Sequence, residues 1–112
     1  MTHRFQVLIL AEAEEFLSTL EQSAREKVIY NLRKARSTND SELFKKLKDN
    51  IWEFRTLYNK TQYRLLAFWD KQDKQNTLVI CTHGVIKKTS KIPPKEILKA
   101  VEAMNNYFDN KE

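Results

Sequence analysis

The chain has 112 residues, of which 41% are hydrophobic and 31% charged, with one Gly, two Pro and one Cys. This length predicts one domain over residues 1–112, and the composition excludes a collagenous, low-complexity or disulfide-stapled protein. Twenty Lys and Arg against fifteen Asp and Glu give a net charge of +5. Without a signal-peptide pattern or the ~20-residue apolar stretch of a membrane helix, we expect a soluble, cytoplasmic protein that does not bind membranes.

The positive charge is concentrated in the second half of the sequence. Residues 50–99 hold ten basic and four acidic side chains, a net of +6, whereas residues 1–20 and 100–112 each carry a net of −2. A local cationic surface attracts polyanions and releases counterions when it binds them. The charge distribution therefore indicates a polyanion such as nucleic acid as a partner, and the alternative is a solvated, solubilising surface.

The first third of the sequence predicts a strand and a helical hairpin. Residues 4–10 (RFQVLIL) are apolar and β-branched, which indicates a strand buried on both faces. The hairpin is predicted over residues 11–36, and the polar run at 37–41 ends it. Ser23 and Glu26 have the spacing of a capping box, which predicts that the second helix begins there. Acidic residues favour the first turn of the first helix: Glu12, Glu14 and Glu15.

The rest of the sequence predicts three strands and a helix. The strands, joined by short polar connections typical of an antiparallel meander, are expected at residues 51–57, 63–69 and 78–83. Alternation places Arg55 and Arg64 on the faces opposite the main apolar side chains. The C-terminal helix spans 94–108 and begins with Pro94. The order β-α-α-β-β-β-α predicts an α+β fold: a mostly antiparallel sheet packed on one side by the helical hairpin and the C-terminal helix.

Six side chains on adjacent predicted strands and the following loop form the candidate site: Glu53, Arg55, Arg64, His83, Lys87 and Lys88. Cleavage of RNA by its own 2′-OH needs a base, cations at the phosphate and an acid, and it needs no metal. Guanidinium groups suit phosphate oxygens. His83 has the unperturbed pKa best suited to proton transfer, with Glu53 or a Lys of lowered pKa as alternatives.

Each candidate also has a plainer interpretation. Arg55 and Arg64 are then solvated strand residues paired with Glu53, His83 is a structural histidine, and Lys87 belongs to an ordinary basic loop. We expect no metal or cofactor, because one Cys and two His lack zinc-ligand spacing and no phosphate-binding glycine motif occurs. The one cysteine lies in an apolar strand, where an inert thiol is favoured over a nucleophile: Cys81.

Three motifs carry a family resemblance: Leu47-x4-Trp52-Glu53-Phe54-Arg55, Tyr63-Arg64-Leu65-Leu66-Ala67-Phe68 and His83-Gly84-x2-Lys87-Lys88-Thr89-x-Lys91-x-Pro93. With the Glu96-Ile97-x2-Ala100 start of the last helix, they resemble the RelE/HigB superfamily of type II toxins, and most of all its phage-derived HigB-like addiction-module killer proteins. Relatives often have an aromatic residue where this chain has Val85 and Ile86, and a late tyrosine to which Tyr107 corresponds only loosely.

The resemblance implies a RelE-like fold and a ribosome-dependent endoribonuclease (mRNA interferase) that inhibits translation. It implies catalytic roles for the matching residues Arg55, Arg64, His83, Lys87 and Lys88, with Glu53 as the other acid or base candidate. Lys60 and Lys91 belong to the basic excess that we expect to bind RNA. The implied partners are the ribosome with its rRNA, the mRNA and a cognate HigA-like antitoxin with a helix-turn-helix domain. The rival is a non-catalytic RNA- or protein-binding module of the same fold.

Overall fold

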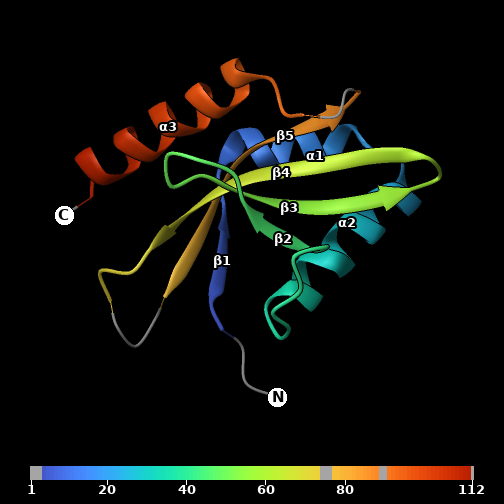
Figure 1. Cartoon of the computed structure of the whole chain (residues 1–112), viewed down its shortest axis with the longest axis horizontal. Coiled ribbons are helices and arrows are strands. Elements are labelled where there is room, and N and C mark those ends of the chain that lie inside the picture. The colour runs from blue at the N-terminus through green and yellow to red at the C-terminus, as the bar shows by residue number, and fades with distance from the viewer. Residues whose placement is uncertain (1–3, 74–76, 89–90, 112) are drawn as a thin grey trace.

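The computed structural model describes residues 4–73, 77–88 and 91–111. These residues form an α+β fold with three helices and an open, mixed sheet of five strands (Figure 1). The elements are β1 (Gln6–Ile9), α1 (Ala11–Thr19), α2 (Gln22–Ala35), β2 (Phe44–Lys46), β3 (Trp52–Tyr58), β4 (Thr61–Asp70), β5 (Leu78–Lys87) and α3 (Pro94–Asp109). The predicted elements are confirmed apart from their ends, and the short strand β2 is an addition to the predicted order.

The sheet has the strand order β1-β5-β4-β3-β2. Strands β2 to β5 form an antiparallel meander, and β1 pairs in parallel with β5, which confirms a mostly antiparallel sheet. Only one face of β1 is packed: Val7 and Ile9 contact the core, whereas Leu8 is 43% exposed. The prediction that this strand is buried on both faces is therefore wrong.

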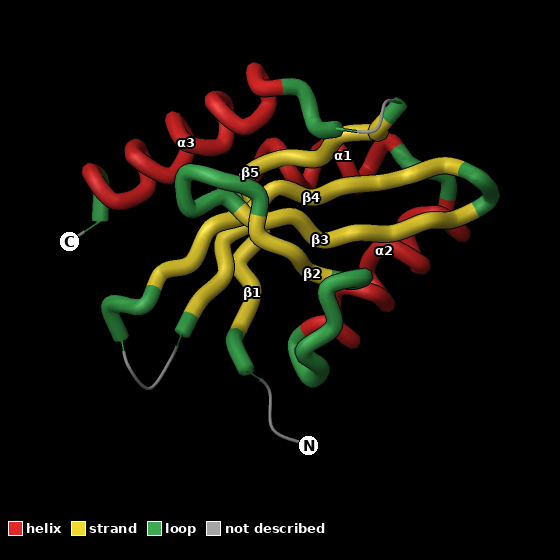
Figure 2. The backbone as a smooth tube through the Cα atoms, viewed as in Figure 1, coloured by secondary structure: helices red, strands yellow, loops and turns green. Residues whose placement is uncertain are grey.

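Helices cover both faces of the sheet, and the prediction that they share one side is wrong (Figure 2). The hairpin of α1 and α2 packs on one face, here called the hairpin face, against side chains that include Leu65 and Ala67. Helix α3 packs on the other, the α3 face, against Leu66 and Phe68. The centre of β4 is apolar at consecutive positions, so both of its faces need cover.

The helix starts agree with the predictions in two of three cases. Acidic residues occupy the first turn of α1, and Pro94 is the first residue of α3. The capping box is wrong: α2 begins at Gln22, its N-cap is Glu21 without a side-chain capping bond, and Ser23 lies inside the first turn. Within the described ranges, no helix combines the length and apolar character that crossing a membrane requires.

Strand β5 contains a β-bulge at Thr82. Leu66 pairs with His83 but the next residue of β4, Ala67, pairs with Cys81, so Thr82 is an extra residue on β5. Before the bulge, even-numbered residues such as Ile80 face α3. After it, the odd-numbered residues do, because a bulge shifts the alternation by one position. The strand also runs to Lys87 rather than ending at residue 83, so His83 lies in its middle.

The reversed alternation turns Gly84 toward the hairpin face, where a Cβ atom would lie 2.1 Å from Cδ2 of Phe16. Overpacking at such a contact forces side chains and backbone apart, so we expect Gly84→Ala to lower the free energy of unfolding by about 1–3 kcal/mol. Urea denaturation measures the loss. In a Phe16→Ala background the same substitution should cost much less, and an equal loss in both backgrounds would contradict this packing.

Candidate functional site

The α3 face of the sheet brings the predicted charged residues of three strands together. Arg55 of β3 lies directly opposite Arg64 of β4, and Arg64 lies opposite Val85 of β5. Two residues further along, Lys87 of β5 pairs with Gln62 of β4, so both lie on the same face as Arg64 and Val85. The strand register therefore places two guanidinium groups and one ammonium group side by side, as the sequence predicts.

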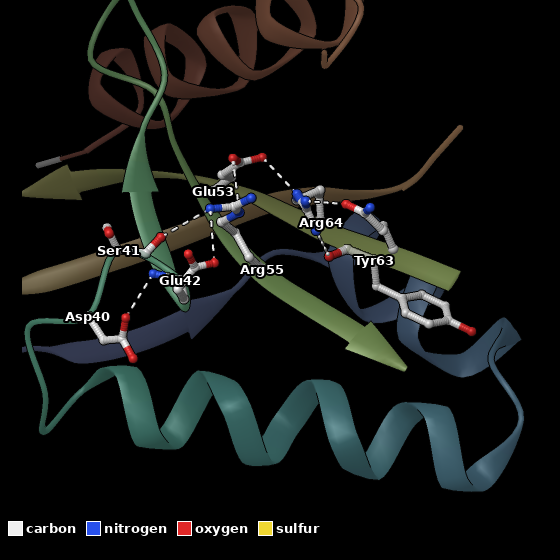
Figure 3. A network of polar contacts seen from close by, with 8 residues as sticks. Asp40, Ser41, Glu42, Glu53, Arg55, Tyr63 and Arg64 are labelled. Carbon is white, nitrogen blue, oxygen red and sulfur yellow. Dashed lines mark hydrogen bonds and ion pairs between the residues drawn. The ribbon is translucent and has the colours of Figure 1, made fainter. Parts of the chain in front are cut away.

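Glu53 lies between the two arginines (Figure 3). Its Oε1 is 3.1 Å from Nε of Arg64, and its Oε2 is 3.6 Å from Nε of Arg55. Arg64 also donates hydrogen bonds to the Gln62 side chain at 2.6 Å and to the backbone oxygen of Tyr63 at 3.1 Å. One carboxylate thus offsets two cations that would otherwise repel each other across the strands.

Several polar atoms of this cluster are buried without a hydrogen bond. Among the residues described, Nε of Arg55, Nε of Arg64 and Oε1 of Glu53 have no hydrogen-bond partner, because their mutual contacts are ion pairs without hydrogen-bond geometry. Only 2% of the Arg64 side chain and 5% of the Glu53 side chain are exposed. A buried donor without an acceptor is costly, and an incoming anion would relieve this cost.

A cavity of about 350 Å³ opens beside the cluster, between the sheet and the start of α3. Glu53 is the one acidic residue among those described in its lining, which otherwise combines basic and aliphatic residues: Lys45, Lys48, Arg55, Lys87 and Lys91, then Leu47, Ile92 and Ile97. We call it the basic cavity. A second hollow of about 230 Å³ is lined by Arg64 and Gln62 and shares Arg55 with the first.

The electrostatics of the cluster favour proton transfer at Lys87. Burial lowers the pKa of Lys87, and the positive charges of Arg64 and Arg55 lower it further, against an opposing effect of Glu53. Burial also lowers the pKa of Arg64, against the stabilising charge of Glu53. A lysine with a lowered pKa is a better acid toward an alkoxide leaving group, so Lys87 joins the candidates for acid catalysis.

His83 lies outside the lining of the basic cavity. Only 3% of it is exposed, because the start of α3 covers it. Its Nε2 is 3.1 Å from Oε1 of Glu96, and its Nδ1 is 2.9 Å from Oγ1 of Thr82. Burial lowers the pKa of His83, which favours a neutral ring held between Glu96 and Thr82. This geometry is that of a residue that anchors α3.

The three remaining predicted residues, Lys60, Lys88 and Lys91, lie in different parts of the structure. Lys91 lines the basic cavity, and Lys88 is exposed directly after β5. Lys60 is exposed in the two-residue turn at the far end of the β3–β4 hairpin, where φ is 66°. Lys45 and Lys48, which strand β2 and its turn bring to the cavity, were not among the predicted site residues. The KKLK run at 45–48 is the signal that could have indicated them.

We find neither a metal-ligand cluster nor an accessible thiol in the described part of the chain. It contains no group of three or more His, Cys, Asp or Glu side chains placed to hold a metal ion. Complete burial raises the pKa of the Cys81 thiol to about 12, which agrees with an unreactive core residue.

Comparison with protein families identifies a match over most of the chain. The family model described as "Phage derived protein Gp49-like (DUF891)" matches residues 15–105. The chain belongs to this family. The match includes all the residues of the charged cluster and of the basic cavity in this Gp49-like protein. No curated protein matches the sequence.

Glu53 should contribute strongly to the stability of the Gp49-like fold. Removing one partner of a buried ion pair leaves an uncompensated charge, so we expect Glu53→Gln to lower the free energy of unfolding by about 3–5 kcal/mol. Glu42 is the matched control, because it lies 3.8 Å from Arg55 but its side chain is 83% exposed. Glu42→Gln should change stability by less than about 1 kcal/mol in the same denaturant titration. Equal effects of the two substitutions would show that Glu53 does not hold the cluster together.

The stability of the protein should decrease on mild acidification because of His83. The unfolded ring has a pKa near 6.5 and the folded ring a lower one, so the unfolded state binds more protons between the two values. The contribution of the neutral His83 ring to the free energy of unfolding is complete above pH 6.5 and is lost as the pH falls through the pKa of the folded ring. Unfolding free energies measured across this range should fall for the wild type and fall less for His83→Gln. Parallel pH profiles would exclude this role.

Proposed function

We propose that this Gp49-like protein is the toxin of a type II toxin–antitoxin pair and that it cleaves mRNA on the ribosome. The family is associated with toxins of toxin–antitoxin systems, and the sequence motifs resemble the RelE/HigB superfamily. The observation that supports cleavage best is the basic cavity, where five cationic side chains meet an aliphatic wall beside guanidinium N–H groups that lack an acceptor. Such a site suits a phosphate with its nucleoside attached.

The proposed reaction is an attack of the RNA 2′-oxygen on the adjacent phosphorus, which forms a 2′,3′-cyclic phosphate and releases the 5′-oxygen. Arg55 and Arg64 neutralise the phosphate charge as the pentavalent transition state forms. Glu53, which lines the cavity, accepts the 2′ proton. Lys87 gives its proton to the departing 5′-oxygen, in keeping with the lowered pKa of its ammonium group. The two proton transfers balance, and solvent restores both groups.

His83 acts on this reaction through α3 and does not contact the substrate. Its bond to Glu96 holds the first turn of the helix, and Ile97 of the same turn forms part of the aliphatic wall. From the sequence alone, His83 was the first candidate for proton transfer. Glu53 and Lys87 both line the basic cavity whereas His83 does not, so they are the better placed pair.

The proposed partners are the ribosome with its rRNA, the mRNA and a cognate antitoxin. The cationic surface suits the phosphates of RNA, and an antitoxin with acidic side chains would compete for the same groups. A HigA-like antitoxin with a helix-turn-helix domain remains the expectation from the resemblance, and these partners imply action in the cytoplasm.

Mapping of mRNA ends in a reconstituted translation reaction tests the proposal. We expect translation-dependent cuts with the wild type and a rate about 10²–10⁴-fold lower with Lys87→Ala, because general acid catalysis is lost. Arg55→Ala should also lower the rate, about 10²-fold. Lys34→Ala is the matched control, since Lys34 is exposed on α2, on the opposite side of the sheet.

The same assay separates the proposal from its rival, a binding module without catalysis. The rival is favoured by one observation, the neutralisation of the arginines by Glu53 inside the protein itself. RNA binding without any translation-dependent cut would favour the rival and contradict the interferase proposal.

A further inference from the structure

A second cavity of about 460 Å³ lies on the other side of the β2–β3 turn from the basic cavity. Trp52 and Trp69 line it from the sheet, and α3 contributes Met104 and Phe108. The exposed lysines Lys46 and Lys71 and the turn residue Asn50 complete the described lining, which contains no acidic side chain. Its volume is within the range of about 300–1,000 Å³ that is typical of small-ligand sites. We call it the tryptophan cavity.

Trp69 lines this cavity and carries a buried hydrogen-bond donor. The Nζ atom of Lys71 lies 4.8 Å from the centre of a Trp69 ring, a cation–π contact. The indole N–H of Trp69 is buried, and among the described residues it has no hydrogen-bond partner. Trp52 packs edge-on against Trp69, with ring centres 5.6 Å apart. An acceptor on a bound ligand would satisfy the indole donor.

The tryptophan cavity and the basic cavity are joined by lysines of one hairpin. On β2, Lys45 lines the basic cavity, and Lys46 lines the tryptophan cavity, because successive strand residues point to opposite faces. In the turn that follows, Lys48 lines the basic cavity and Asn50 lines the tryptophan cavity. A strand of RNA that passes over this turn would meet Lys45, Lys46 and Lys48, against the one exposed carboxylate of Asp49 in the turn.

We propose that the tryptophan cavity binds a further nucleotide of the same single-stranded RNA that the basic cavity holds. The base lies against the apolar and aromatic lining, with an acceptor toward the Trp69 N–H, and the phosphate lies between Lys46 and Lys71. The identity of the strand as mRNA rests on the proposed function, whereas the cavity's preference for a nucleotide rests on its own lining.

Tryptophan fluorescence tests this inference directly, because the only two tryptophans of the chain both line the cavity. We expect a short unstructured single-stranded RNA to change the emission saturably in the absence of ribosomes. In the double variant Lys46→Ala/Lys71→Ala, affinity should fall about tenfold or more. The slope of log affinity against log salt should become shallower by about 0.7, since the contacts to one phosphate are lost. Lys34→Ala serves as the charge-loss control and should bind like the wild type.

Two further outcomes separate this subsite from the cleavage proposal. Lys87→Ala should lose cleavage but keep the fluorescence change, because Lys87 does not line the tryptophan cavity. An emission that RNA leaves unchanged, or that responds equally in the double variant, would overturn the subsite even if mRNA is cleaved. A response to an acidic peptide but not to RNA would also overturn it and would assign the cavity to a protein partner.

Discussion

The extra residue at Thr82 decides which side chains of β5 share a face with the arginines. Upstream of the bulge, Ile80 faces α3, and with uninterrupted alternation Lys87 would point toward the helical hairpin instead. The bulge reverses the phase, so that His83 reaches Glu96 and Lys87 joins the charged cluster. It also turns Gly84 toward Phe16, where no side chain fits. The packing of α1 and the composition of the site therefore both depend on one register shift.

Glu53 makes the resulting concentration of positive charge compatible with folding. Arg55 and Arg64 face each other across neighbouring strands, an arrangement that is destabilising when nothing offsets it. The carboxylate compensates one of the two charges, and burial together with the remaining positive charge lowers the pKa of Lys87. Groups with shifted pKa values beside a cavity are typical of functional sites. Glu53 therefore contributes both to the stability of the sheet and to the reaction that we propose.

Local patterns in the sequence predicted part of this site correctly. Alternation in β3 and β4 was enough to place Arg55 and Arg64 together, because both strands are long and regular. Strand β2 has only three residues, too few for a periodic signal, and its pairing with β3 supplies Lys45 to the cavity. The expected end of β5 at residue 83 was wrong because the strand continues through Gly84, which packs closely against Phe16 of α1.

The sequence by itself determined the α+β class, the helical hairpin, the amphipathic last helix and the basic character of the second half, since these follow from composition and from periodicity within single segments. Only the tertiary structure decided that α3 covers the face opposite the hairpin, that His83 is buried beneath it, and that a second cavity forms around the two tryptophans. These features depend on strand register and on contacts between residues distant in sequence, which no local pattern encodes.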